Sequence, residues 1–120
     1  MGKPLPKAGV FAHGEAKVVA RKGASFWTKI FAVNFAAGAD ALKLFPAEAS
    51  SPAALRAMLT VLPPRSAVLP VGGIGPEVMG AWLAAGAAGF GIGSALFRPG
   101  ISADDASQRA TRLVSAVRAA

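Results

Sequence analysis

The feature that most constrains the fold of this chain is the regular order of short apolar runs and helix signals that begins after Gly38. Apolar runs occupy Ala41–Phe45, Val68–Val71 and Gly89–Gly93, and a stretch with helix signals follows each of them. Strands that alternate with helices pair in parallel through right-handed crossovers. Continuous apolar runs are typical of parallel strands that are covered on both faces. We therefore predict an α/β fold with three parallel βα units over residues 38–120, preceded by an irregular or helical N-terminal segment, residues 1–37.

Residues that favour helix ends bound the three expected helices. A serine can cap a helix start, proline suits the first position, and proline or glycine stops a helix. The start signals are Ser51, Pro52, Pro76 and Ser102, and the stop signals are Pro63, Pro64 and Gly86. The expected buried faces are Leu55, Met58, Leu59 and Leu62, then Val78, Met79, Trp82 and Leu83, and finally Ala106, Ala110, Leu113, Val114 and Val117. Spacing near the helical period also predicts a helix from Ser25 to Ala37.

The composition excludes several kinds of site and partner. The absence of cysteine excludes disulfides and thiolate metal sites, and His13 alone cannot build a zinc site. No apolar run reaches the roughly 18 residues that a membrane span needs. No secretory signal is evident, so we expect a cytoplasmic protein without a membrane partner. Hydrophobic residues make up 53% of the 120 residues, which is enough to build a core.

The positive charge is concentrated near the N-terminus. Residues 1–36 carry six lysines and arginines against Glu15, a net charge of +5, while residues 37–120 carry seven against five acids, a net charge of +2. A basic arm of this kind could bind an acidic partner. Stacking aromatic residues do not interleave with the basic ones, so we do not expect nucleic acid as a partner.

Lys43 is the only lysine after Lys29 and lies within the first apolar run. Alternation along a strand places Lys43 on the same face as Ala41 and Phe45. An unpaired ammonium buried on such a strand is costly, so burial favours the neutral amine, a nucleophile that can form an imine with a carbonyl. The alternative is a strand-end lysine that extends to water along its own stem. The run by itself favours that alternative, whereas the residues that follow favour the nucleophile.

Glycine turns end the second and third runs. In parallel α/β folds, ligands bind at the carboxyl ends of the strands. The glycines Gly72, Gly73 and Gly93 leave backbone N–H groups open to close approach by a phosphate, and Ser94 adds a hydroxyl donor. Glycine also suits tight turns for structural reasons alone. The combination of two neighbouring turns with Lys43 nevertheless favours a phosphate site.

Two residues after Lys43 each have two interpretations. Phe45 could shield the Lys43 amine and stack on a substrate, or it could fill the core. Glu48 could pair with Lys43 or cap the next helix, and we assign it no role in proton transfer.

Three motifs carry a resemblance to a known family: Leu42–Glu48, Pro70–Ile74 and Gly91–Arg98. They resemble those of the 2-keto-3-deoxy-6-phosphogluconate/6-phosphogalactonate aldolase family, over residues 38–120. The resemblance implies a trimeric (β/α)₈ TIM barrel, of which this segment forms the last three βα units. It also implies a class I aldolase that cleaves a phosphorylated keto sugar acid to pyruvate and glyceraldehyde 3-phosphate, with no metal or cofactor.

The same resemblance assigns the site residues. Lys43 falls on the imine lysine of the family. The residues that fall on the substrate site are Phe45, Val71, Gly72, Gly73, Gly93 and Ser94. Val71 stands where gluconate-type enzymes tend to carry threonine, so the galactonate branch is favoured.

The N-terminal segment does not show the remaining family features. A complete barrel needs more βα units than residues 38–120 provide. The family's general base is a glutamate from an early strand, and Glu15 is the only acid before Asp40. We therefore expect a truncated and inactive relative, a fragment that must associate, or a phosphate-binding half-barrel without catalysis.

Overall fold

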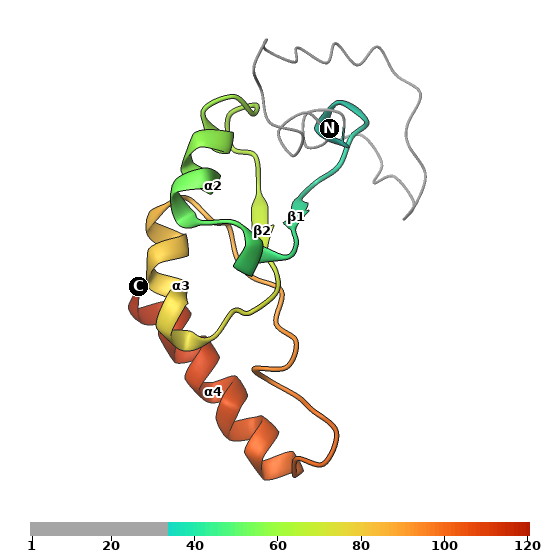
Figure 1. Ribbon diagram of the computed structural model, residues 1–120, viewed down its shortest axis with the longest axis vertical. Coiled ribbons are helices and arrows are strands. Elements are labelled where there is room, and N and C mark those ends of the chain that lie inside the picture. The colour runs from blue at the N-terminus through green and yellow to red at the C-terminus, as the bar shows by residue number, and fades with distance from the viewer. Residues whose placement is uncertain (1–33) are drawn as a thin grey trace, which may run out of the picture.

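The computed structural model describes residues 34–120 (Figure 1). The order of its elements is β1 (Leu42–Leu44), the 3₁₀ helix η1 (Ala47–Ala49), α2 (Pro52–Leu59), β2 (Val68–Pro70), α3 (Pro76–Ala84) and α4 (Ala103–Ala119). The predicted alternation of strands and helices is confirmed over this range, and η1 is an element that the sequence analysis missed. Of the helix predicted from Ser25 to Ala37, residues 34–36 are helical, Ala37 is in a turn, and residues 25–33 lie outside the described residues.

The two strands form a parallel pair. Leu42 lies opposite Val68, and Leu44 lies opposite Pro70. Leu42, Leu44 and Val68 are buried because these side chains face the helices, while the residue between the two leucines is exposed. The parallel pairing that the βα alternation predicted is therefore confirmed for β1 and β2.

The prediction of a third continuous strand over Gly89–Gly93 is wrong. Within residues 34–120, β1 and β2 form a two-stranded sheet, and the third segment contributes one isolated parallel bridge, between Val71 and Gly91. The backbone nitrogen of Ala88 donates to the oxygen of Val68 at 3.0 Å, and that of Gly91 donates to the oxygen of Pro70 at 3.0 Å. The donors are three residues apart and the acceptors two, so one extra residue interrupts the ladder, as in a β-bulge.

The interrupted segment still lies at the expected place. β1 bonds to the backbone of Ala67 and Val71 in the second run, whereas the third segment bonds to Val68 and Pro70. Alternate residues of a strand direct their backbone groups to opposite edges. The third segment therefore runs along the edge of β2 that faces away from β1.

Side-chain caps fix the starts of α2 and α4. The Ser51 hydroxyl accepts a hydrogen bond from the backbone nitrogen of Ala54 at 3.1 Å. The Ser102 hydroxyl accepts one from the nitrogen of Asp105 at 3.0 Å. Both predicted N-caps are confirmed, because each serine satisfies an N–H group that has no partner within its helix.

The predicted start and end of α3 are also confirmed. Pro76 occupies the first turn, where its missing N–H costs nothing. Gly86 adopts φ +107° just after the helix. The nitrogen of Ala87 then donates to the oxygen of Trp82 at 3.0 Å, and that of Gly86 donates to Leu83 at 3.0 Å. These two bonds form a Schellman motif, which requires a residue that tolerates positive φ.

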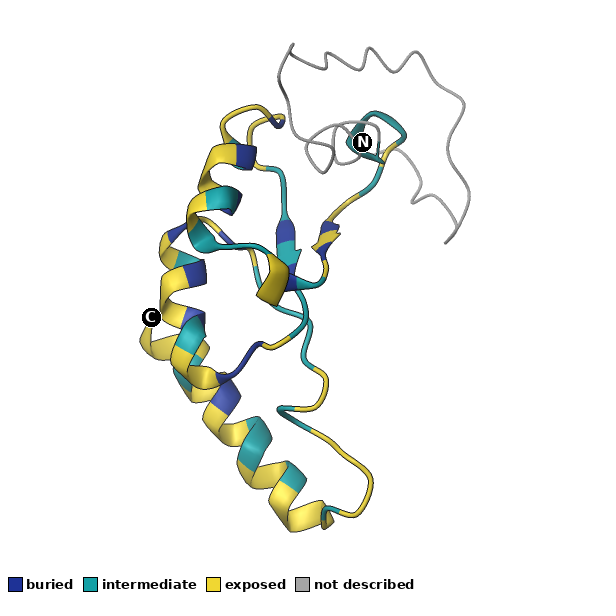
Figure 2. Cartoon of the chain, in the orientation of Figure 1, coloured by how far each residue is buried: buried dark blue, intermediate teal, exposed yellow. Residues whose placement is uncertain are grey.

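The core lies between the strands and the helices, which lie on one side of the strands (Figures 1 and 2). Its buried members are Leu42, Leu44, Ala47, Leu55, Met58, Leu62, Val68, Ile74, Met79, Trp82, Ala85, Ala87 and Leu113. The opposite face of β1 is not covered by any element of residues 34–120. The expectation that both faces of the strands are buried is therefore wrong for β1 in the described part of the chain.

The buried face predicted for α4 is only partly right. Leu113 is buried, but Val114 is 47% exposed and Val117 is 39% exposed. Of the described elements, α3 is the one that α4 contacts most, so the stripe around Leu113 is covered and the two valines are not. No helix in residues 34–120 has the length and apolar character needed to cross a membrane.

Candidate functional site

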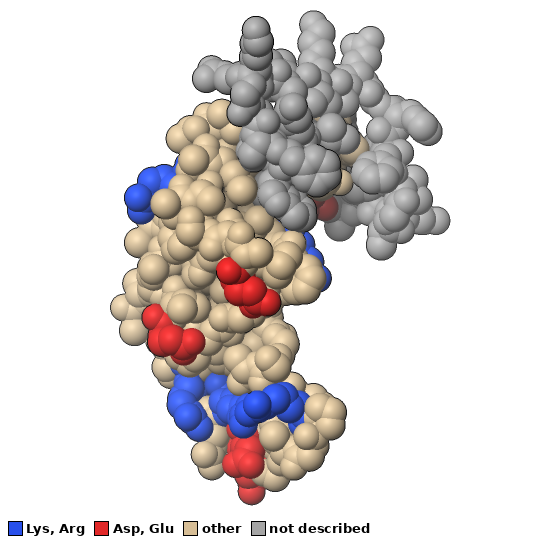
Figure 3. Space-filling model, viewed as in Figure 1, with Lys and Arg blue, Asp and Glu red and all other residues tan. Residues whose placement is uncertain are grey.

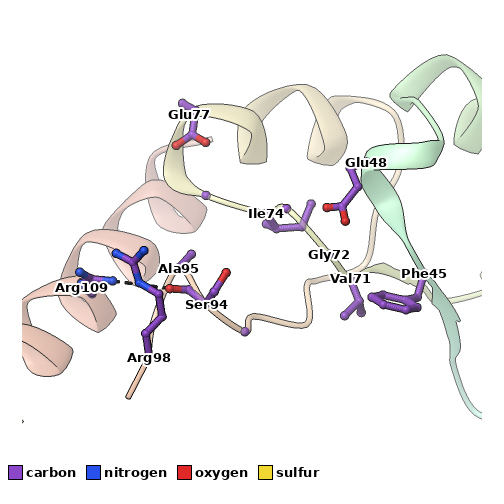
Figure 4. Close-up of a pocket in the computed structure, with 13 residues that line it drawn as sticks. Phe45, Glu48, Val71, Gly72, Ile74, Glu77, Ser94, Ala95, Arg98 and Arg109 are labelled. Carbon is purple, nitrogen blue, oxygen red and sulfur yellow. Dashed lines mark hydrogen bonds between the residues drawn. The ribbon is translucent and has the colours of Figure 1, made fainter. Parts of the chain in front are cut away.

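A cavity of about 560 Å³, here called the main cavity, lies where β1, β2 and the third segment end (Figure 4). Six of the seven residues predicted for the site line it: Phe45, Val71, Gly72, Gly73, Gly93 and Ser94. These residues are up to 49 positions apart, from 45 to 94, and they meet because the carboxyl ends of parallel strands share one edge of a sheet. The structure thus brings most of the predicted site together at one place.

The glycine turn after β2 is shaped by both conformation and close contact. Gly72 has φ +105° and Gly73 has φ +67°, values that favour glycine. A Cβ on Gly72 would lie 3.2 Å from ring atoms of Phe45. A Cβ on Gly73 would overlap the carboxylate of Glu48. The turn therefore lets Phe45 and Glu48 lie directly against bare main chain.

Lys43 is exposed in the described part of the chain, residues 34–120. The prediction that its amine is buried is therefore wrong there. The physical reason is that no described element covers its face of β1. Its Nζ lies 4.9 Å from the centroid of the Phe45 ring, which is within the range of a cation–π contact. Lys43 does not line the main cavity, but it lies against a residue that does. Its role as the imine lysine stays a prediction.

The alternatives for Phe45 and Glu48 can now be resolved. Phe45 is 52% exposed, so it does not fill the core, and its ring contacts the Lys43 amine. Glu48 does not cap α2, whose N-cap hydrogen bond comes from Ser51. It lies in η1 with its carboxylate against Gly73, and within residues 34–120 it makes no salt bridge with Lys43. Both interpretations that the sequence suggested for Glu48 are therefore wrong.

Two arginines line the main cavity at the end away from Phe45. Arg109 donates a hydrogen bond from Nη1 to the backbone oxygen of Ser94 at 3.5 Å. Figure 4 shows the guanidinium groups of Arg98 and Arg109 beside Ser94, while Glu48 lies toward Phe45. The two arginines therefore supply positive charge beside Ser94, which suits the anionic group of a ligand, while Glu77 is an acidic residue of the same lining.

Sequence reasoning assigned no site role to either arginine. Arg98 stands in a family motif, and its position just after the Ser94 turn was an available signal. Arg109 lies 15 residues beyond Ser94 in the sequence and reaches the site only because α4 packs back against α3. Glu77, in the first turn of α3, is a further charged residue of the lining that was not predicted.

Two curated proteins that share one enzyme name match this chain over about 80 residues. The curated 2-dehydro-3-deoxy-6-phosphogalactonate aldolase of Escherichia coli is 46% identical over 84 residues, which are 70% of this chain and 41% of that protein. A probable aldolase of the same name from Rhizobium meliloti is 41% identical over 81 residues, 68% of this chain and 38% of that protein. The chain thus spans about two fifths of the length of these relatives.

Solved structures agree with the sequence matches. A native KDPGal structure superposes with a TM-score of 0.72 at 43% identity, over 77% of this chain and 44% of that chain. A cube-shaped protein cage, designed by fusing symmetric oligomeric domains, matches with a TM-score of 0.71 at 43% identity, over 77% of this chain and 34% of that chain.

The family described as KDPG and KHG aldolase matches residues 15–113. This match begins inside the segment 1–37, where the sequence motifs quoted above do not occur. The family has a TIM-barrel fold, and the parallel βα order of residues 34–120 is compatible with part of such a barrel. The chain belongs to the KDPG and KHG aldolase family.

Proposed function

We propose that this chain provides the imine lysine and the phosphate site of a class I aldolase for 2-keto-3-deoxy-6-phosphogalactonate. The observation that carries the proposal is the main cavity, which joins the Phe45 end, beside Lys43, to the glycine turns and Ser94. The close relatives named phosphogalactonate aldolase support the choice of substrate. Val71, rather than threonine, lines this cavity and favours the galactonate epimer over the gluconate epimer.

The proposed chemistry begins with attack of the Lys43 amine on the C2 carbonyl of the substrate. Loss of water gives an imine, whose protonated form accepts the electron pair of the C3–C4 bond as the C4 hydroxyl gives its proton to a water molecule. The fragment that contains carbons C4 to C6 leaves as glyceraldehyde 3-phosphate. Protonation of the enamine at C3 and hydrolysis of the imine then release pyruvate and restore the amine. No metal or redox partner is required for this balance.

The Ser94 end of the main cavity positions the substrate relative to Lys43. A phosphate placed at Gly73, Gly93 and Ser94 accepts hydrogen bonds from backbone N–H groups and from the serine hydroxyl. Binding of this remote group positions the carbonyl for attack, so phosphate affinity contributes to the rate as well as to the KM. Phe45 lies between Lys43 and Gly72 and contributes an apolar wall near the reacting carbon.

The experiment is reductive trapping with pyruvate and borohydride, followed by mass spectrometry of the digested protein. We expect a reduced adduct on Lys43, in excess over the other lysines. Lys43→Arg should abolish it, while the matched change Lys29→Arg at the preceding lysine should leave it intact. Folded protein that gives no preferential adduct on Lys43 would contradict imine chemistry.

A second function is favoured by one observation, the exposure of Lys43. A lysine at this position can extend to water along its own stem without reacting, so the chain would then be a phosphate-binding half-barrel without catalysis. In that case Lys43→Ala would leave the affinity for glyceraldehyde 3-phosphate unchanged and no pyruvate adduct would form. If the adduct forms, the catalytic proposal holds.

We also propose that the chain acts as a homotrimer, as the family resemblance implies. The exposed Val61, Phe97 and Val117 in the described residues leave apolar surface for association. Light scattering coupled to size-exclusion chromatography measures the mass directly. A stable folded monomer of 12.0 kDa would contradict this assembly.

A further inference from the structure

A second and smaller cavity of about 260 Å³ lies between α3, α4 and the loop after Ser94. Its lining consists of Pro76, Ala95, Arg98, Arg109, Arg112 and Leu113, and we call it the arginine cavity. Half of these residues are arginines and none is acidic. Arg98 and Arg109 also line the main cavity, whereas Arg112 lines only this one.

The three arginines of this lining come from two parts of the chain. Arg109 and Arg112 are three residues apart on α4 and so project from the same face. Arg98 reaches the same place from the loop before the helix. In Figure 3 the basic side chains form a continuous band across this part of the surface. The fold therefore places three basic residues around one small cavity.

These charges are not neutralised within the described part of the chain. Arg98, Arg109 and Arg112 make no salt bridge to a carboxylate of residues 34–120. Asp104 and Asp105 stand in the first turn of α4 and Glu77 lines the main cavity with Arg98 and Arg109, but none of these three acids lines the arginine cavity. Like charges held together repel one another, and an anion between them would relieve that repulsion.

The shape and donors of the cavity favour one class of anion. The guanidinium group offers a planar fork of N–H donors that matches phosphate oxygens in a bidentate way. Pro76, Ala95 and Leu113 supply an apolar floor that adds no competing acceptor side chain. The volume is less than half that of the main cavity, which suits a single small anion rather than a whole sugar acid.

We propose that the arginine cavity is a second anion site, which binds a phosphate-class dianion through Arg112 together with Arg98 and Arg109, the two arginines that it shares with the main cavity. This inference does not rest on the proposed aldolase function, because it needs neither Lys43 nor an imine. A failure of pyruvate trapping would leave it intact, and its own failure would leave the trapping result intact.

The experiment follows the arginine side-chain N–H signals by NMR while inorganic phosphate replaces chloride at constant ionic strength. We expect saturable shifts at Arg112, the arginine that lines only this cavity, and little change at Arg118, which lies on the same helix but lines neither cavity. Uniform, non-saturating shifts at all arginines would overturn the proposal, because they would reflect general screening alone.

Three variants separate the two sites. Loss of one charge-assisted contact in Arg112→Gln should weaken phosphate binding at the arginine cavity by about tenfold. The matched change Arg118→Gln removes the same charge from α4 and should leave the affinity within about twofold. Ser94→Ala alters only the main cavity and should leave the Arg112 shifts unchanged. Equal effects of Arg112→Gln and Arg118→Gln would overturn the assignment.

The source of the anion is resolved by a parallel titration with glyceraldehyde 3-phosphate. Tighter binding of inorganic phosphate at Arg112 assigns the cavity to the free anion, and tighter binding of the ester assigns it to a phosphorylated metabolite. In either case Arg112→Gln must weaken the binding. If neither compound saturates the Arg112 signal, the cavity is not a phosphate site.

Discussion

Replacing Gly91 by alanine probes the bulged segment that stands in place of a third strand. A Cβ at this position would lie 2.5 Å from Cγ2 of Val71 and 3.0 Å from its Cγ1. Gly91 does not have the positive φ of the turn glycines, so backbone strain does not contribute. The cost therefore comes from crowding between two segments that the backbone bridge Val71–Gly91 holds together.

Overpacking of this kind destabilises by about 1–3 kcal/mol, so we expect Gly91→Ala to lower the free energy of unfolding by that amount. Val71 is half-buried, and truncating it should cost about 1 kcal/mol for the methyl groups removed from contact. In the double variant Gly91→Ala with Val71→Ala, the new methyl occupies the space that the valine leaves. The double variant should therefore be more stable than the sum of the single effects by about 1–2 kcal/mol.

Equilibrium urea unfolding followed by circular dichroism measures these differences. The matched control is Gly80→Ala, since apart from the helix's own nearby backbone no atom lies within 4 Å of the added methyl, and the site is inside α3. Removing a glycine from a helix interior should raise stability by about 0.5–1 kcal/mol. The reasoning is refuted if Gly91→Ala is as stable as the wild type, or if truncation of Val71 restores nothing.

The remaining predictions use the same unfolding assay. Ser51→Ala removes the side-chain cap of α2 and should cost about 1 kcal/mol; no loss would mean that water replaces the cap without penalty. Leu55→Ala opens a cavity at a fully buried position and should cost about 2–5 kcal/mol, and a loss below about 1 kcal/mol would contradict the described core. On α4, Leu113→Ala should cost about 2–5 kcal/mol, whereas Val114→Ser should stay within about 0.5 kcal/mol. Comparable losses at both positions would show that a partner covers the exposed valine.

Local rules account for the parts of the fold that sequence predicted well. The caps Ser51 and Ser102 and the stop at Gly86 depend on hydrogen bonds within a few residues, so the residue types alone indicate them. The meeting of Phe45 with the glycine turns needs only the rule that parallel strands end at one edge. Each of these predictions involves either short-range bonding or a property common to all parallel sheets.

The wrong predictions depend on long-range packing. Whether Lys43 is buried depends on what covers the far face of β1, and no residue of the run itself specifies that cover. The bulge at Gly91 depends on how two segments align over their length, which composition does not fix. Arg109 enters the site through the orientation of α4 against α3, and the helical period of α4 gives no information about it.

The contacts at the Phe45 end of the site form a continuous series. The Lys43 amine lies on the Phe45 ring, the ring lies against the bare main chain of Gly72, and the adjacent Gly73 holds the Glu48 carboxylate. Side chains on Gly72 or Gly73 would therefore displace Phe45 or Glu48 from the main chain. Ser94 and its partner Arg109 bound the other end of the same cavity, so the glycine turn shapes the Phe45 end of the main cavity while Arg109 lies at the Ser94 end.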